Sequence, residues 1–211
     1  MGRFKKAGAS WRQEAQQVND HDFRSTAIGM AVPYGIYDER TKRGFMCVGT
    51  SCDTPEFAVQ CIVQWWRDEG GKRYPNRPDV LIVADGGGSN GSRSRLWKSA
   101  VQEKLCDRFG LSVSVAHYPP GASKWNPIEH RLFSEISKNW AGEPLDSYET
   151  ILKFIRTTKT TTGLKVRSRL VSKQYKKGIA VSDERMEALN ITRPDTLPKW
   201  NYTLNPIQDS G

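Results

Sequence analysis

The spacing of apolar residues alternates along the chain between the pattern of a strand and the pattern of a helix, which predicts alternating strands and helices. Residues 28–37 and 45–50 are apolar runs around a charged, glycine-ended turn, which predicts a β-hairpin whose first strand is an edge or bulged strand because of Pro33. Residues 57–65 have helical spacing after the capping sequence Asp53-Thr-Pro-Glu56, and Gly70-Gly71 is the expected end of this helix. Residues 79–84 are almost continuously apolar, which predicts a central parallel strand covered on both faces.

The second half of the chain continues the alternation. We expect a helix near 94–109, an alternating strand over 111–117, a helix that begins at Asn126 and a short helix near 150–158. This order predicts an α/β three-layer fold with a mixed sheet. It resembles the ribonuclease H-like core with its first strand missing. We expect an N-terminal arm (1–25), a catalytic core (26–148) and a basic extension that packs on the core (149–211).

Charge and composition narrow the class of partner. The formal net charge is +9, from 32 Lys and Arg against 23 Asp and Glu. Residues 150–182 contain nine basic side chains and no acidic one, which favours a polyanionic partner. No run of about eighteen apolar residues predicts a membrane span, and no secretory signal is recognisable. The four cysteines lack metal-binding spacing, which predicts reduced, mostly buried thiols in the cytoplasm.

Asp85 is the first candidate for chemistry because it ends the most apolar strand. Functional groups of open α/β sheets gather at the carboxyl ends of strands, and magnesium prefers carboxylate oxygens together with substrate phosphates. The glycines of Gly86-Gly-Gly-Ser-Asn-Gly91 would let a substrate approach, and Ser89, Asn90 and the strand-end His117 are candidate phosphate contacts. The alternatives are that Asp85 starts an ordinary turn and that His117 is a satisfied strand-end histidine.

Glu129 is the second candidate carboxylate. Asn126-Pro-Ile-Glu129 has a purely structural interpretation, in which Asn126 caps a helix and Glu129 closes a capping box. In the functional interpretation Glu129 points towards Asp85, and Lys124 and Trp125 contact a phosphate and a base or sugar. His130 would help to hold a metal or the scissile phosphate, or lie on the surface.

A basic strand is the candidate DNA contact. Lys165, Arg167 and Arg169 alternate with other residues, so a strand here would have one basic face for a DNA backbone. A solvated edge strand protected by its charges is the alternative. The pair Trp65-Trp66 fits a core position better than a base-stacking platform.

The motifs taken together resemble one family. The segments DGGGSNG and HYPPGASKWNPIEHRLFSEISKNWAGEPL, with VPYGIYD, SYETIL and PKWNYTLNP, resemble the catalytic domain of the Rhodopirellula-type DDE transposases of bacterial insertion sequences. The resemblance implies a ribonuclease H-like fold in which three carboxylates bind two Mg²⁺ ions, with Mn²⁺ as a substitute. By position, Asp85 matches the second carboxylate and Glu129 the third. It also implies DNA cleavage and strand transfer, one chemistry with two nucleophiles.

The first carboxylate of this pattern has no counterpart here. In the family it lies just upstream of a segment that resembles residues 2–8, so we expect an N-terminal truncation that removes the first strand, its Asp and any N-terminal DNA-binding domain. Asp20, Asp22 and Asp38 are three carboxylates that precede the central strand, and we expect all three to be solvated. A site with two of three carboxylates would hold its metals weakly.

Three functions are compatible with the sequence. The first is a transposase fragment that acts on double-stranded DNA at element ends and target, as a homo-oligomer or with a full-length transposase, near the bacterial nucleoid and with impaired activity. The second is a non-catalytic DNA-binding remnant or regulator of a full-length transposase. The third is another two-metal nuclease of the same fold, with Asp20 or Asp22 as the missing ligand.

Overall fold

The chain forms two compact units, each built on its own mixed sheet. The computed structural model describes residues 1–8, 18–19, 25, 27–119 and 121–207. One unit consists of Met1–Ser51 and Pro127–Gln174, and the other of Cys52–Asn126 and Tyr175–Gly211. The predicted mixed α/β class is confirmed. The expected division into arm, core and extension stays a prediction.

The first unit contains a three-stranded sheet in the order β1-β2-β5. Strands β1 (Val32–Asp38) and β2 (Arg43–Gly49) form the predicted antiparallel hairpin. Strand β5 (Lys165–Val171) runs parallel to β2. Pro33 lies in β1 at the edge of this sheet, as predicted, and an edge strand is where a proline is tolerated.

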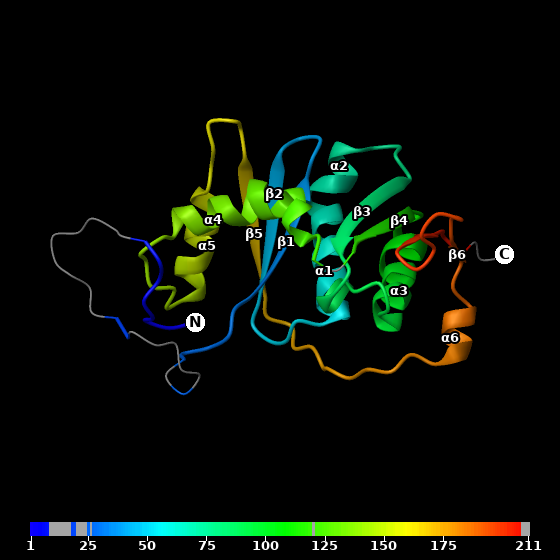
Figure 1. Ribbon diagram of the computed structural model, residues 1–211, viewed down its shortest axis with the longest axis horizontal. Helices are drawn as coiled ribbons and strands as arrows, with labels where there is room; N and C mark the ends of the chain where they lie inside the picture. The colour runs from blue at the N-terminus through cyan, green and yellow to red at the C-terminus, as the bar shows by residue number, and fades with distance from the viewer. Residues whose placement is uncertain (9–17, 20–24, 26, 120, 208–211) are drawn as a thin grey trace. The chain divides into compact units, whose positions relative to one another are not determined.

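Helical segments cover one face of this sheet (Figure 1). They are the π-helical turn η6 (Glu129–Phe133), α4 (Ser134–Asn139) and α5 (Tyr148–Thr157). Ser147 caps α5 by accepting a hydrogen bond from the backbone N–H of Thr150 (3.1 Å). The buried core between helices and sheet contains Met46, Val48, Leu132, Ile136, Ile151, Leu152, Ile155, Leu164 and Val166.

The second unit contains a four-stranded sheet in the order β3-β4-β7-β6. Strands β3 (Asp79–Asp85) and β4 (Ser112–Tyr118) are parallel, and β7 (Asn201–Leu204) pairs antiparallel with both β4 and β6 (Ile191–Thr192). The sequence did not predict β6, β7 or the short helix α6 (Asp183–Glu187).

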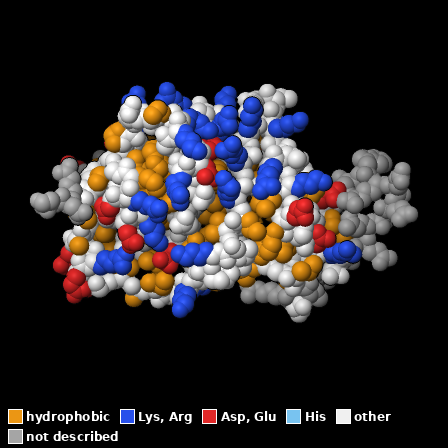
Figure 2. Space-filling model, turned by 180° about the vertical axis from the view of Figure 1, so that it is seen from behind, with side chains coloured by type: hydrophobic (Ala, Val, Ile, Leu, Met, Phe, Trp, Pro, Cys, Tyr) orange, Lys and Arg blue, Asp and Glu red, His pale blue; other side chains and the backbone are white. Residues whose placement is uncertain are grey.

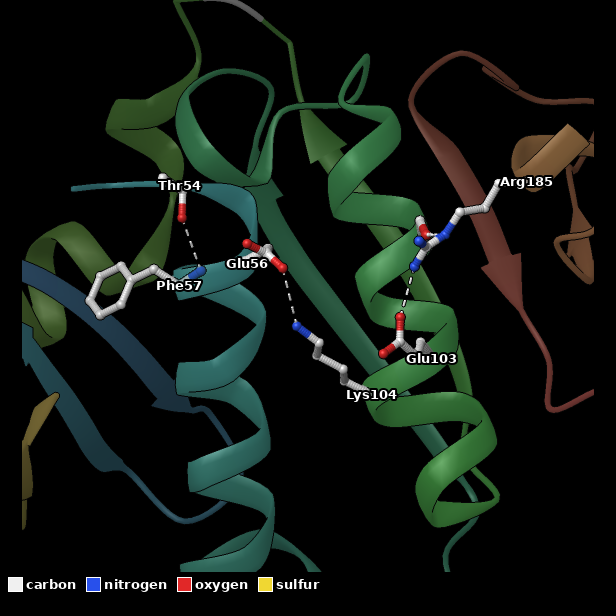
Figure 3. A network of polar contacts seen from close by, with 7 residues as sticks. Thr54, Glu56, Phe57, Glu103, Lys104 and Arg185 are labelled. Atoms are coloured by element: carbon white, nitrogen blue, oxygen red, sulfur yellow. Dashed lines mark hydrogen bonds and ion pairs between the residues drawn. The ribbon is translucent and has the colours of Figure 1, made fainter. Parts of the chain in front are cut away.

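Two helical segments pack beside this sheet, and polar contacts join them to each other and to α6 (Figure 3). The first is α1 (Pro55–Trp65) with η2 (Trp66–Gly70) and α2 (Gly71–Arg73), and the second is α3 (Arg95–Val101) with η4 (Gln102–Asp107). Thr54 caps α1 as predicted, with Oγ1 accepting from the N–H of Phe57 (3.2 Å). Glu56 pairs with Lys104 (3.5 Å), and Arg185 of α6 pairs with Glu103 (2.8 Å).

Two predictions about this unit are wrong. The first helical segment passes through Gly70-Gly71 and ends at Arg73, because both glycines adopt right-handed helical backbone angles. Strand β3 lies at the edge of its sheet, and Leu81 (67% exposed) and Val83 (47%) face away from the helices. An unbroken apolar run indicates that a strand suits burial on both faces. It does not determine whether other elements cover both faces of that strand.

Two findings concern the chain as a whole. In the part of the chain that the structure describes, no helix is long and apolar enough to cross a membrane. All four cysteines are free thiols, and Cys47, Cys61 and Cys106 are buried.

Candidate functional site

Asp85 is the last residue of β3, at the carboxyl end of a parallel strand pair, as predicted. Its side chain is half-buried, and Oδ1 accepts a hydrogen bond from Nδ2 of Asn126 at 3.1 Å. Oδ2 has no hydrogen bond or ion pair with any described residue. Asp85 therefore has one oriented oxygen and one oxygen that remains available to a ligand.

The glycine loop after Asp85 is tight on one side and open on the other. A Cβ on Gly86 would lie 2.7 Å from the carbonyl oxygen of Tyr118 and 2.8 Å from the Trp200 ring, so only glycine fits without a shift. A Cβ on Gly87 or Gly88 would meet no atom within 4 Å. The predicted phosphate contacts Ser89 and Asn90 follow in the 3₁₀ turn η3 (Gly88–Asn90), where Ser89 is buried. The loop is thus fixed at its base and open to a ligand at its tip.

A chain of buried hydrogen bonds holds the backbone of Asp85. Nε1 of Trp97 lies 2.9 Å from the Tyr202 hydroxyl, which lies 3.2 Å from Nε2 of His117. Nδ1 of His117 lies 3.2 Å from the backbone oxygen of Asp85. An indole N–H only donates and a carbonyl only accepts, so this network assigns the proton of the neutral imidazole to Nδ1 and makes Tyr202 the donor to Nε2. Both nitrogens of His117 are satisfied, as its structural interpretation expected.

Burial supports this assignment. It lowers the pKa of His117; the hydrogen bond to the Asp85 carbonyl opposes the shift, and the charge of Lys98 adds to it. Burial also raises the pKa of Tyr202. The imidazole and the phenol are therefore both neutral near pH 7, and the chain of hydrogen bonds carries no net charge.

Lys98 is a buried cation that the sequence did not single out. Its Nζ donates to the carbonyl oxygen of Ser92 (2.6 Å) and lies 5.3 Å from the centre of the Tyr202 ring. Burial, and secondarily the charge of Arg193, lowers the pKa of Lys98. Only its place on the inward side of α3, beside Trp97, could have indicated it from sequence. Lys98 ties the end of the glycine loop to α3.

Glu129 belongs to the first unit, whereas Asp85 belongs to the second. Glu129 begins η6, its side chain is half-buried, and its carboxylate makes no hydrogen bond or ion pair with the described residues. The capping box that would explain Glu129 structurally is therefore not formed. His130 follows it in η6 and is exposed.

Lys124 and Trp125 lie in the 3₁₀ turn η5 (Ser123–Trp125), directly before Asn126. The backbone N–H of Trp125 donates to the carbonyl of Ala122 (2.9 Å), which fixes the turn. The Trp125 side chain is 70% exposed, and Nζ of Lys124 lies 5.3 Å from its ring centre. A large exposed aromatic ring beside a cation is suited to stacking on a nucleobase.

The predicted basic face of β5 is present. Lys165, Arg167 and Arg169 are exposed, and the alternating Val166 and Ser168 are buried. Figure 2 shows many Lys and Arg side chains on one face, together with smaller groups of Asp and Glu side chains. The first unit therefore presents a row of positive charge on a regular strand.

Each of the two candidate carboxylates suits a magnesium-type cation in chemistry, but the described residues supply no complete ligand set. Asp85 and Glu129 each have carboxylate oxygens without a protein partner among the described residues, and such hard oxygens suit Mg²⁺. No group of three His, Cys, Asp or Glu side chains in the described ranges could hold a metal ion. Asp20 and Asp22 lie outside the described residues. The prediction for Asp38 is wrong, because Asp38 is buried and accepts a hydrogen bond from the backbone N–H of Thr41 (3.2 Å).

A carboxylate at a strand end beside an open glycine loop lies where open α/β sheets bind ligands, and a basic strand suits contact with a nucleic-acid backbone. The chain belongs to the Rhodopirellula transposase DDE domain family, whose model matches residues 1–206. No curated protein and no solved structure matches this chain. Membership confirms the family resemblance and the ribonuclease H-like α/β class, and it makes this a transposase-type domain of insertion sequences. The family generally uses divalent metal ions and acts on DNA.

Proposed function

We propose that this domain binds double-stranded DNA and carries two of the three carboxylates of a transposase metal site, Asp85 as the second and Glu129 as the third. The observation that carries the proposal is Asp85, with an unpartnered oxygen at a strand end beside an open glycine loop. Two Mg²⁺ or Mn²⁺ ions would activate the attacking oxygen and stabilise the leaving oxygen of an in-line displacement. The role of Asp85 and Glu129 is to hold these ions.

We propose that the site is incomplete with these two residues and that independent cleavage and strand transfer are impaired. The described residues contain no cluster of three metal-binding side chains. Strand β3 also has an open edge next to Asp85, with Leu81 and Val83 exposed. A further strand paired with β3 along this edge could bring a carboxylate beside Asp85.

We assign DNA-backbone contact to Lys165, Arg167 and Arg169, and base and phosphate contact near the site to Trp125, Lys124 and His130. Each cation on a phosphate releases a counterion, so the slope of log affinity against log salt changes by about 0.9 per contact. Replacing the three β5 cations with alanine should therefore reduce this slope by roughly 2.7. The matched control replaces three exposed cations of the second unit, Lys72, Arg77 and Arg108, and should change the slope less.

The test combines DNA binding with plasmid nicking in Mg²⁺ or Mn²⁺. We expect salt-dependent binding to a short duplex, and nicking that is weak or absent in the wild-type chain. Any nicking above background should disappear in Asp85→Asn and in Glu129→Gln. Robust strand transfer by the wild-type chain would contradict the incomplete site, and the absence of duplex binding would contradict the proposal as a whole.

A non-catalytic DNA-binding regulator of a full-length transposase is the second candidate. The β5 cations support this second candidate, because contact between these cations and DNA requires no metal-binding residue. A cellular phenotype that persists in the double variant Asp85→Asn with Glu129→Gln would favour the regulator. Loss of the phenotype in that variant, with DNA binding intact, would favour the catalytic role.

A further inference from the structure

Asn126 is a buried amide directly before the helix that carries Glu129. Its side chain is 7% exposed, and Nδ2 donates to Oδ1 of Asp85 at 3.1 Å. Asn126 follows η5, whose backbone is closed by the hydrogen bond from Trp125 N–H to the Ala122 carbonyl. The sequence explained Asn126 as a helix cap, but that role does not require contact with a strand-end carboxylate.

The chemistry of this contact differs from that of an ion pair. A hydrogen bond to one oxygen restricts the rotation of the carboxylate and directs its other oxygen. Lys or Arg in the place of Asn126 would do the same, but its positive charge would repel a divalent cation. A neutral amide orients the carboxylate and leaves its negative charge available to the metal.

The backbone of Asp85 is held independently of its side chain. His117 donates to the carbonyl oxygen of Asp85 through Nδ1. The hydrogen bonds from Trp97 to Tyr202 and from Tyr202 to Nε2 of His117 fix the other side of the imidazole. The remaining freedom of Asp85 is rotation of its side chain, and Asn126 is the described residue that limits this rotation.

We propose that Asn126 is a positioning residue that orients the Asp85 carboxylate for a divalent cation. This inference rests on the proposed metal-binding role of Asp85. Partners of metal ligands commonly change metal affinity by 10- to 100-fold when they are removed. Asn126→Ala should therefore weaken cation binding about tenfold without removing any metal ligand.

The experiment titrates Mn²⁺ into the DNA-free chain and follows the free ion by electron paramagnetic resonance. We expect Asn126→Ala to raise the Mn²⁺ dissociation constant about tenfold and Asp85→Asn to abolish the same binding. Asn201→Ala is the matched control, because it removes a side-chain amide bond of the same unit, from Nδ2 to the Thr196 carbonyl, and should leave affinity unchanged.

A second measurement uses the wild-type chain and does not depend on the folding of a variant. The side-chain amide resonances of Asn126 should broaden on addition of Mn²⁺ before those of Asn201 do. Equal affinities of Asn126→Ala and Asn201→Ala would overturn the positioning role while Asp85 remains a ligand. The absence of selective broadening would contradict Mn²⁺ binding at Asp85 itself, because broadening depends on the distance to the ion and Asn126 lies beside Asp85. Equal binding by wild type and Asp85→Asn would instead overturn the metal site, and the role of Asn126 with it.

Discussion

Removing one hydroxyl group should destabilise the second unit strongly, because Tyr202 joins two other buried polar groups. Tyr202 is 2% exposed, and its hydroxyl accepts from Trp97 Nε1 at 2.9 Å and donates to His117 Nε2 at 3.2 Å. In Tyr202→Phe, Nε1 of Trp97 and Nε2 of His117 lose their hydrogen bonds to the hydroxyl while both groups remain buried. Each such group costs about 1–3 kcal/mol, so we expect a loss of about 2–6 kcal/mol of unfolding free energy. This is a large part of the roughly 5–15 kcal/mol that typically stabilises a domain.

The assay is urea denaturation, combined with amide hydrogen exchange in β4 and β7 to isolate the second unit. Tyr118→Phe is the matched control, because the Tyr118 side chain is half-buried and makes no hydrogen bond with a described residue. Adding Trp97→Phe to Tyr202→Phe should cost less than the sum of the two single changes, because the pair shares one hydrogen bond. A loss below about 0.5 kcal/mol in Tyr202→Phe, the range of ordinary surface substitutions, would refute this account.

The other predictions concern thiols, the glycine loop and the exposed tryptophan. Cys52 should react first with an aromatic disulfide reagent, and Cys106 should stay unmodified at pH 8. Burial, reinforced by the charge of Asp107 and opposed by a backbone hydrogen bond from Val113, raises the pKa of the Cys106 thiol to about 12. Peptide mass spectrometry checks this, and early labelling of Cys106 would contradict it. Gly86→Ala should lower the unfolding free energy by about 1–3 kcal/mol, and Gly87→Ala should lower it by less than about 0.5 kcal/mol, because only a Cβ at Gly86 meets other atoms. Equal effects of the two substitutions in thermal unfolding would contradict this. Trp125→Ala should weaken binding of a single-stranded oligonucleotide by about 1–3 kcal/mol in fluorescence titrations, and unchanged binding would remove the stacking role.

Local signals in the sequence predicted the elements of the fold well. Thr54, one of the two possible caps in Asp53-Thr-Pro-Glu56, caps α1, and β5 forms where the alternation of Lys165, Arg167 and Arg169 allowed a strand. Such features depend on neighbours along the chain. Strand β7 was missed because its four residues are too short for a periodic signal.

The candidate site was predictable only in part, because its supports are distant in sequence. Asp85 and its glycine loop could be identified from a strand-then-turn pattern. The bond from Asn126 to Asp85 spans 41 positions, and the bond from Trp97 to Tyr202 spans 105. No periodicity within one segment carries that information. Lys98 was missed for a similar reason, because its burial depends on Tyr202 and on the turn of the chain at Ser92.

The two proposed activities depend on different parts of the fold, so one can be lost without the other. The residues that hold Asp85, namely Asn126, His117 and Tyr202, belong to the second unit. The basic strand β5 belongs to the first unit, where its buried Val166 packs in the same core as Met46, Val48 and residues of α5. The proposed metal site and the proposed DNA contact can therefore be lost separately. The bond from Asn126 orients the Asp85 carboxylate within the second unit alone, so this orientation does not depend on Glu129.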